Sequence, residues 1–395
     1  MNQSIQKMLG IDGKEKELSP WIPLSIEEIK KRDDIELHVI APFFRILRNQ
    51  TFSDKNVHYY CIRIGMPFFK RPWPAKYRLD VWTNFFIFNN QVKNLVEKIN
   101  PDLVNLQGAE NAIYSTSILK IKRYPILITI QGFITLNDQN DSKDSYIKKR
   151  LEIEKKILSV MKYFGAEASF MEDYIKSFNP QAKIFFFHWP YAKPGIKSDV
   201  PKEYDIVFFA RIDKRKGIED LIKAMSIVKI RRPMVSLIII GKCDESYVLW
   251  LKKIVEERGL KSNVVFKGYI PTQEEMHNEV AKARISVLPT YNDTIAGTVV
   301  ESMNLGIPVI SYNVGGNPDL NLDDEHLILV EKGDVEKLAF EIEELLNSKE
   351  RQVKLAEKAL KYASVEFDNT NSINKLIMAY RSIIEESSST TIKQI

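Results

Sequence analysis

Residues 285–320 read ISVLPTYNDTIAGTVVESMNLGIPVISYNVGGNPDL, and this stretch decides the expected fold. An apolar run that ends at Pro289 predicts a buried strand, and a polar loop that carries Asp293 follows it. A helix is expected to begin near Gly297, and the apolar run at 308–312 predicts the next strand. Strand, loop, helix and strand in this order indicate a βαβ unit of a parallel sheet.

The helix that begins near Gly297 predicts an anion site. The first N–H groups of a helix have no partner within it and carry partial positive charge, so they bind phosphate. We expect the amides of Gly297, Thr298 and Val299 to contact a phosphate. Glu301 would then accept hydrogen bonds from two ribose hydroxyls, with Asp293 nearer to a sugar. An alternative stays open, because Thr298 and Glu301 also fit a capping box that merely closes the helix start.

A basic loop lies in the stretch FFARIDKRKGIEDLIKAM at 208–225, where Arg211 and Lys216 stand between a strand and its helix. In a parallel sheet this loop lies at the same edge as the helix start described above. Two cations at that edge would stabilise the charge of a leaving diphosphate without a metal ion. The alternative is a basic surface loop, since Lys214 and Arg215 adjoin them.

The same alternation of strands and helices extends along most of the chain. We expect strands at 35–41, 57–64, 102–106, 126–130, 183–187, 206–210, 236–241, 264–268, 285–289 and 308–312, with amphipathic helices between most of them. At 395 residues the chain exceeds the size of one ordinary core. The expected fold class is therefore α/β, with two Rossmann-like, doubly wound domains that face a cleft.

The expected domain boundaries follow from composition. Residues 188–203 contain three prolines and one glycine and no apolar periodicity. We expect five segments: an N-terminal domain at 1–190, a linker at 191–203, a C-terminal domain at 204–370, a helix returning to the N-terminal domain at 371–386, and a disordered tail at 387–395.

These motifs resemble the family-four retaining glycosyltransferases, also described as glycosyl transferases group 1, which have the GT-B fold. Asp293, seven residues and then Glu301 before Met-x-x-Gly-x-Pro-Val-Ile are similar to the family's Glu-x7-Glu region, with aspartate in the first position. The loop with Arg211 and Lys216 resembles the family's Gly-Arg-x4-Lys-Gly loop, with Ala210 in place of the glycine.

The resemblance implies a metal-independent, hexosyltransferase-like enzyme that needs no cofactor beyond its nucleotide-sugar donor. Arg211, Lys216 and Asp293 would be catalytic, and the acceptor hydroxyl would attack the face from which the diphosphate leaves. The segments ending in Gly241 and in Tyr269 and Ile270 would lie beside the nucleotide. The acceptor would be a glycan or a lipid-linked glycan, in bacterial surface polysaccharide synthesis by analogy with the family.

The first domain is expected to supply the acceptor side. Gln131 ends a predicted strand where many relatives of the family place a histidine, and Glu110 follows the neighbouring strand. Residues 1–21 show neither an opening apolar strand nor a glycine-rich loop, so the first strand of this domain is expected to be missing or atypical.

Composition excludes several other classes. A net charge of +5 is too weak to indicate nucleic-acid binding, and no nucleic-acid-binding motif is present. The five histidines show no spacing typical of metal ligands, and no Gly-x-Ser-x-Gly motif indicates a hydrolase. Two distant cysteines and the absence of a signal sequence or a long apolar run favour a cytoplasmic protein.

A membrane contact and two other functions remain open. Aromatic and cationic residues interleave over 65–78, which indicates peripheral contact with the inner face of an anionic membrane or, alternatively, a loop folded into the core. The other functions are a catalytically inactive binding or scaffold protein and a sugar-nucleotide epimerase of the same fold. The sequence does not indicate an oligomeric state.

Overall fold

A computed structural model of the chain describes residues 21–66, 71–74, 77–136, 144–195 and 200–392. The chain divides into two compact units. Unit 1 contains the described residues up to Glu167, Met171–Pro190 and those from Asn369, and unit 2 contains Ala168–Phe170 and Tyr191–Asp368. Both units combine parallel strands with helices, so the predicted α/β class is confirmed.

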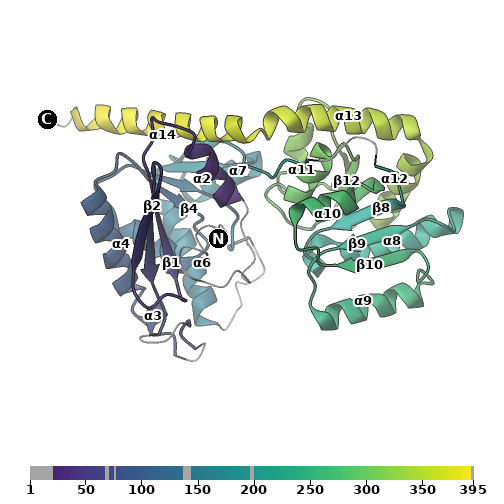
Figure 1. The fold of residues 1–395 in the computed structure, drawn as a ribbon, viewed down its shortest axis with the longest axis horizontal. Coiled ribbons are helices and arrows are strands. Elements are labelled where there is room, and N and C mark those ends of the chain that lie inside the picture. The colour runs from purple at the N-terminus through teal and green to yellow at the C-terminus, as the bar shows by residue number, and fades with distance from the viewer. Residues whose placement is uncertain (1–20, 67–70, 75–76, 137–143, 196–199, 393–395) are drawn as a thin grey trace. The chain divides into compact units, whose positions relative to one another are not determined.

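The sheet of unit 2 has six parallel strands in the order β10-β9-β8-β11-β12-β13. Their bounds are β8 Tyr204–Phe209, β9 Leu237–Ile240, β10 Val264–Gly268, β11 Ala283–Leu288, β12 Val309–Tyr312 and β13 Ile328–Val330. Figure 1 shows β10, β9, β8 and β12 following one another in this order. The chain order changes direction between β8 and β11, which is where doubly wound sheets bind ligands.

Helices connect these strands. They are α8 Ile218–Arg231, α9 Glu245–Glu257, α10 Gln273–Val280, α11 Gly297–Asn304, α12 Val335–Asn347 and α13 Lys349–Glu366, with 3-10 turns η2 Lys214–Lys216 and η3 Asn317–Asn321. Side-chain caps begin several of them, since Asp244 accepts from the amides of the first turn of α9 and Thr272 does so for α10. The apolar runs predicted from sequence form the core of unit 2, in which the residues of β9 and β12 are all buried.

Unit 1 contains a four-stranded parallel sheet in the order β4-β5-β6-β7. The strands are β4 Val104–Gln107, β5 Ile126–Thr129, β6 Tyr163–Ala166 and β7 Lys183–Phe186. The helical elements along this part of the chain are α3 Leu79–Trp82, α4 Phe86–Ile99, α5 Ala112–Ser115, η1 Thr116–Lys120, α6 Ser145–Val160 and α7 Ser169–Phe178. Asp144 caps α6 by accepting from the amides of Tyr146 and Ile147.

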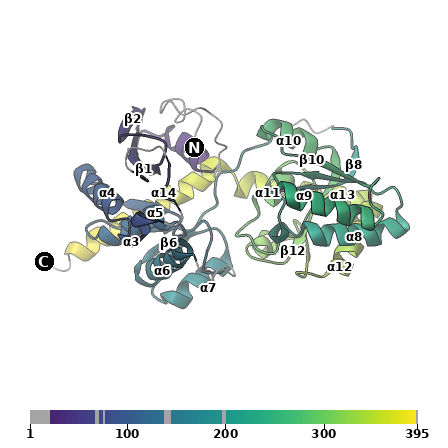
Figure 2. The same ribbon diagram turned by 90° about the horizontal axis from the view of Figure 1, so that it is seen from below.

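A separate three-stranded sheet follows helix α2 (Trp21–Ile29) in unit 1. Its order is β1-β3-β2, with β1 at Leu37–Phe43 parallel to β3 at Val57–Arg63, and β2 at Gln50–Asp54 antiparallel to β3. Figure 2 shows β1 and β2 apart from β6. The sequence did not predict β2, because QTFSD is mostly polar and lies at a sheet edge with little burial.

The C-terminal helix α14 runs from Asn369 to Ile392 and belongs to unit 1. The Tyr380 hydroxyl lies 2.6 Å from Asn105 Nδ2, and Glu386 accepts from Lys162 and Lys183 at 2.8 Å each. The expected disordered tail at 387–395 is wrong for residues 387–392, which continue the helix. Residues 393–395 lie outside the described residues.

The expected linker at 191–203 falls within unit 2, whose boundary is at Tyr191 rather than 204. The reason is packing, since the Tyr191 ring meets Phe367 edge-on at 5.5 Å and Lys193 pairs with Asp368 at 2.5 Å. Residues 196–199 of that linker, and the atypical opening expected at residues 1–20, lie outside the described residues. Within the described part, none of the helices combines the length and apolar character needed to cross a bilayer.

Candidate functional site

The predicted donor residues gather at the switch point of the unit 2 sheet. β8 and β11 are parallel neighbours, with Ser286 opposite Val207. The loop after β8 carries Arg211 and Lys216, and the loop after β11 carries Asp293. Both loops therefore leave the same edge of the sheet, in the place that doubly wound folds use for ligands.

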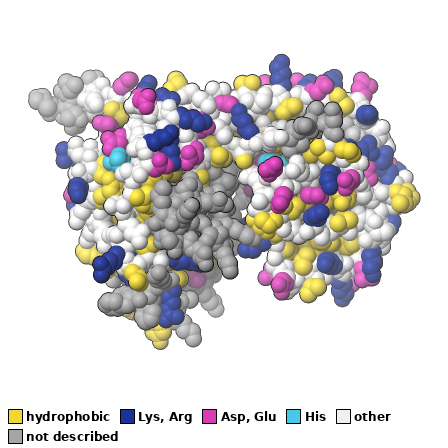
Figure 3. Space-filling model, in the orientation of Figure 1, with side chains coloured by type: hydrophobic (Ala, Val, Ile, Leu, Met, Phe, Trp, Pro, Cys, Tyr) yellow, Lys and Arg dark blue, Asp and Glu magenta, His cyan; other side chains and the backbone are white. Residues whose placement is uncertain are grey.

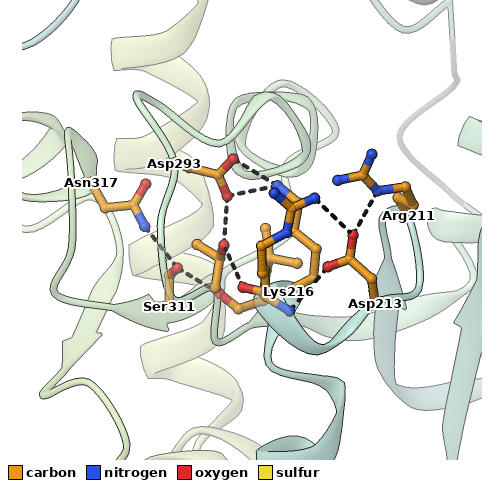
Figure 4. Close-up of polar contacts among 9 residues, drawn as sticks. Arg211, Asp213, Lys216, Asp293, Ser311 and Asn317 are labelled. Atoms are coloured by element: carbon orange, nitrogen blue, oxygen red, sulfur yellow. Dashed lines mark hydrogen bonds and ion pairs between the residues drawn. The ribbon is translucent and has the colours of Figure 1, made fainter. Parts of the chain in front are cut away.

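Lys216 and Asp293 form a direct ion pair. The ammonium Nζ lies 2.6 Å from Oδ1 and 2.8 Å from Oδ2 of the carboxylate, and both side chains are about four-fifths shielded, with 20% and 19% exposed. Thr290 Oγ1 donates to Asp293 Oδ2 at 2.6 Å (Figure 4). The carboxylate is therefore fixed by two neighbours, and it holds the ammonium at the loop junction.

Arg211 lies further out on the same loop. Its Nε donates to Asp213 Oδ2 at 2.6 Å, and 60% of its side chain is exposed. Asp213 also caps η2 by accepting from the Arg215 amide at 3.0 Å (Figure 4). Within the described residues, neither terminal nitrogen of Arg211 makes a hydrogen bond, so both can meet an anionic ligand.

The start of α11 differs from a capped helix. Its N-cap is Ala296, which has no side chain that can cap, and the amides of Gly297 and Thr298 have no acceptor among the described residues. The Val299 amide instead donates to Ala296 O at 2.8 Å, so two of the three expected amides are free and the third is turned inward. Because Thr298 is not the N-cap and Glu301 lies a full turn into the helix, the capping-box alternative is wrong.

The Glu301 carboxylate lies next to two residues of α10 that were not predicted from the sequence. Gln273 Nε2 donates to Glu301 Oε1 at 3.1 Å, and His277 Nε2 lies 3.5 Å from Oε2. His277 is buried and Nε2 has no hydrogen-bond partner among the described residues. Gln273 and His277 are one helical turn apart, which is the spacing that could have identified them. Only 13% of the Glu301 side chain is exposed, and its remaining lone pairs can accept hydroxyls.

Glycines let the loops around this site approach one another closely. A Cβ on Gly315 would lie 1.7 Å from Asp293 O, and one on Gly316 would lie 2.1 Å from Thr294 O. Gly217 meets Pro289 O in the same way at 1.8 Å. The loop after β12 therefore packs directly against the loop of Asp293.

Side-chain hydrogen bonds tie the same loops together. Ser311 Oγ donates to Leu288 O at 2.6 Å, and Asn317 Nδ2 donates to Ser311 Oγ at 2.9 Å (Figure 4). Asn317 and Ser311 are both buried. These residues were not singled out from the sequence, because their role depends on contacts across β11 and β12.

The other predicted nucleotide neighbours lie on the β9 and β10 side. Gly241 packs against Ala210, since a Cβ there would be 1.8 Å from Ala210 O, and its amide donates to Gly268 O at 2.9 Å. Tyr269 is 42% exposed, whereas Ile270 packs against the core of unit 2. Gly241 therefore allows the segments that follow β8, β9 and β10 to pack closely together.

In unit 1, the predicted acceptor residues lie after paired strands β4 and β5. Glu110 Oε2 and Gln131 Nε2 are buried without hydrogen-bond partners among the described residues, and so is Oε1 of Gln107, which ends β4. Burial raises the pKa of Glu110 to about 7. Unsatisfied buried polar atoms at one sheet edge are uncommon and suit a polar ligand.

Residues 194–362, which contain both loops and α11, match the family described as glycosyl transferases group 1. The predicted resemblance to group 1 glycosyltransferases is thereby confirmed for this segment, which includes Arg211, Lys216, Asp293 and Glu301.

Two curated relatives illustrate the range of this glycosyltransferase family. The chain is 28% identical over 188 residues to the capsular polysaccharide biosynthesis glycosyltransferase CapM of Staphylococcus aureus, covering 46% of this chain and 47% of the relative. It is 26% identical over 277 residues to the poly(glycerol-phosphate) alpha-glucosyltransferase of Bacillus subtilis, covering 68% and 39%. The chain thus matches less than half of the length of either relative.

Solved glycosyltransferase structures share the fold over nearly the whole chain. A sucrose-phosphate synthase from Thermosynechococcus elongatus matches with a TM-score of 0.72 at 19% identity, and the match covers 93% of each chain. The Anabaena protein HepE, solved in complex with UDP, has a TM-score of 0.67 at 16% identity, with 95% of this chain and 98% of that chain covered. These likenesses show the GT-B fold, as predicted.

Proposed function

We propose that this chain is a retaining glycosyltransferase that moves a sugar from a nucleoside diphosphate sugar onto a glycan or lipid-linked acceptor. The observation that carries the proposal is the Lys216–Asp293 pair beside the free amides of Gly297 and Thr298 at the switch point of unit 2. Arg211 adds two free guanidinium nitrogens on the same loop. Two cations and two amide donors make a site for a dianionic diphosphate.

The proposed reaction breaks the bond between the sugar anomeric carbon and the β-phosphate oxygen. The acceptor oxygen forms its bond to the same face of that carbon, and the acceptor proton passes to the departing phosphate oxygen. Negative charge grows on the phosphate during this step. Lys216, Arg211 and the amides of Gly297 and Thr298 would stabilise it, because donors fixed in advance need no reorganisation.

Asp293 and Glu301 have separate parts in this proposal. Asp293 orients Lys216 and lies where the donor sugar would meet the loop after β11. An ammonium has three N–H donors, so Lys216 keeps capacity for a phosphate while it contacts Asp293. Glu301, steadied by Gln273, would accept the two ribose hydroxyls.

Metal independence is part of the same proposal. The charge that a divalent ion supplies in other transferases would come here from Lys216 and Arg211. UDP is the first nucleotide to test, since HepE was solved with it. No cofactor other than the donor is proposed.

The acceptor is proposed to bind unit 1 near Gln131 and Glu110. Their unpaired buried Nε2 and Oε2 atoms can hydrogen-bond sugar hydroxyls. The names of CapM and of the poly(glycerol-phosphate) glucosyltransferase favour a cell-surface glycopolymer as the product.

Contact with the inner face of a membrane is proposed for α3 and α4. Five apolar residues there are strongly exposed, at 71%, 51%, 84%, 58% and 73% for Tyr77, Leu79, Trp82, Phe86 and Ile87. Exposed aromatic and aliphatic side chains in one short stretch are typical of interfacial binding. Of the aromatic and cationic residues in 65–78, Arg78 is paired with Asp80 at 2.8 Å, while Phe68, Phe69, Lys70 and Lys76 lie outside the described residues.

We expect the variant with Trp82→Ser and Ile87→Ser to lose binding to vesicles that contain anionic lipid. The loss should be large, because two exposed apolar anchors are removed from the interface. Co-sedimentation with vesicles measures it. Met234→Ser, which removes an equally exposed apolar residue of unit 2, is the control. Equal binding by both variants would show that α3 and α4 do not carry the contact.

The anomeric configuration of the product tests the proposed reaction. Nuclear magnetic resonance of the glycoside formed from an α-linked nucleotide sugar should show an α linkage. A β linkage would contradict retention. An altered sugar still attached to the nucleotide, with no acceptor present, would favour the epimerase alternative, and nucleotide binding without any turnover would favour the inactive scaffold.

A further inference from the structure

A second cluster of polar side chains lies on the three-stranded sheet of unit 1. β1 and β3 are parallel with His38 opposite His58, and the two rings stack with centroids 4.8 Å apart. Ser53 of β2 is opposite His58 in the antiparallel pair. The register of three strands therefore places these side chains in one row, and Glu36 stands just before β1. Figure 3 shows histidine surface (cyan) beside acidic side chains on unit 1.

The distances within the cluster match those around a metal ion. Glu36 Oε1 lies 3.2 Å from His38 Nε2 and 2.9 Å from His58 Nε2. One ligand atom from each residue lies within 4.8 Å of the other two. Two ligands at about 2.0–2.1 Å from a tetrahedral zinc ion are roughly 3.3 Å apart, so a small adjustment would bring these three to one ion.

The far nitrogens of both rings are already fixed. His58 Nδ1 is 2.7 Å from Ser53 Oγ, and His38 Nδ1 is 3.1 Å from the Tyr60 hydroxyl. Metal-binding histidines almost always have such a partner on the second nitrogen, because it sets the tautomer and the ring orientation. Both rings thus present Nε2 to Glu36.

The cluster lies on a sheet whose other face is packed against α2, and its own face is open to solvent. The opposite face of β3 is buried, since Val57 and Tyr59 pack against Ile26 of α2. His38 and His58 keep 23% and 30% of their side chains exposed, and Glu36 keeps 65%. An ion could therefore enter from solvent and take a water as its fourth ligand.

We propose that Glu36, His38 and His58 bind a divalent transition-metal ion, with Zn²⁺ as the best match. Two imidazoles and one carboxylate favour Zn²⁺ over Mg²⁺ and Ca²⁺, which prefer oxygen ligands alone. The site is separate from the donor loops of unit 2 and does not depend on the proposed transferase reaction.

Titration of the metal-stripped full chain with Zn²⁺, by calorimetry or against a coloured chelator, tests the proposal. We expect one ion per chain and no comparable binding of Mg²⁺. Co²⁺ in place of zinc should give the visible absorption of a four-coordinate site. His38→Ala or His58→Ala should weaken Zn²⁺ binding by more than about 100-fold, and Ser53→Ala by about 10-fold, as expected for an outer partner.

Glu36→Gln has a matched control in Asp33→Asn. Both changes remove one exposed carboxylate from the same short segment, but Asp33 is not in the cluster. Equal affinity in these two variants would overturn the proposal. Absence of Zn²⁺ binding by the wild-type chain would also overturn it, and this test does not depend on the folding of any variant. Glu36, His38 and His58 would then form only a hydrogen-bonded cluster.

Discussion

Lys216 and Asp293 join the loop after β8 to the loop after β11, and about four-fifths of each side chain is shielded from solvent. Removing the two charges from water offsets much of their attraction, so the pair contributes little to folding on its own. Its value is positional, because it fixes an ammonium near the free amides of α11. The sequence predicted both residues but not their pairing, since a hydrogen bond between residues 77 apart depends on the sheet order.

Lys216→Ala should lower the rate of transfer by about 100-fold or more while leaving affinity for a nucleoside monophosphate nearly unchanged. The reason is that the lost ammonium acts on charge that grows at the β-phosphate. Steady-state kinetics and calorimetric titration measure the two effects. Lys214→Ala is the control, because Lys214 is an exposed cation of the same turn η2. Similar rates of transfer for both variants would show that Lys216 takes no part in the reaction.

Glu110, on the proposed acceptor side, has a pKa well above the ordinary value of a glutamate. Burial raises its pKa from 4.5 to about 7, and the nearby carboxylate of Glu154 adds to the rise. Its carboxyl oxygens lie close to Gly108, and Oε2 has no hydrogen-bond partner in the part of the chain that the structure describes. The native chain therefore binds this proton more tightly than the unfolded chain, and stability is lost as the pH rises from 4.5 to about 7.

Glu110→Gln should become more stable relative to the wild type as the pH rises from about 5 to about 8. Glutamine cannot ionise, so the variant escapes a loss of at most about 1.4 kcal/mol per pH unit. Urea unfolding at several pH values gives the difference in free energy of unfolding. A difference that does not change with pH would show that Glu110 does not titrate in this range.

At the level of elements, the start of α11 depends on the turn that follows β12. Gly315 has φ of +57°, and a side chain there would collide with the backbone of Asp293. On its own, the Gly315–Gly316 pair is typical of a turn. Its packing role requires knowing that β12 lies next to β11 in the sheet.

Gly315→Ala should lower both the melting temperature and the affinity for a nucleoside diphosphate, because the Asp293 loop must move to admit a Cβ. Gly333→Ala is the matched control, since Gly333 also has positive φ, +84°, but has open space around its Cβ position. Both substitutions strain the backbone, and only one displaces the loop. Equal nucleotide affinity in the two variants would contradict a supporting role for Gly315.

Strand prediction succeeded for most of the buried strands of unit 2. The runs at 206–210, 236–241 and 285–289 correspond to β8, β9 and β11, which are largely or wholly buried. It failed at β2, which is polar, at β13, which has three residues, and at β6 (Tyr163–Ala166), which is wholly buried but has only four residues and includes a glycine. The polar end of α14 was also missed, because a helix can continue without an apolar face when its earlier turns are packed.

The spacing of the histidines along the chain also did not predict which of them lie next to each other. His38 and His58 are twenty residues apart, a separation that indicates no metal motif, yet parallel pairing in register makes them neighbours. Contacts made by sheet order cannot be seen in local sequence.

At the level of the whole molecule, each unit carries its own part of the proposed reaction. Unit 2 holds the matched family segment and all ten predicted catalytic and donor-binding residues, whereas unit 1 holds Gln131, Glu110 and the proposed zinc cluster. The glycosyltransferase resemblance predicted the fold and the family that residues 194–362 match. It could not supply the donor base, the sugar or the acceptor, because those depend on the particular side chains of the site and not on the fold.

The most direct measurement is calorimetric titration with UDP, GDP, ADP, CDP and dTDP in the presence of a metal chelator. One of these diphosphates should bind the wild-type chain with one-to-one stoichiometry and more tightly than its monophosphate. Glu301→Ala should weaken that binding by about 1.5–3 kcal/mol for each lost charge-assisted hydrogen bond, whereas Glu341→Ala, which removes a similarly shielded glutamate paired with Lys337 and Arg351, should not. Binding that requires a divalent ion, or equal affinity in both variants, would contradict a metal-independent donor site at the switch point of unit 2.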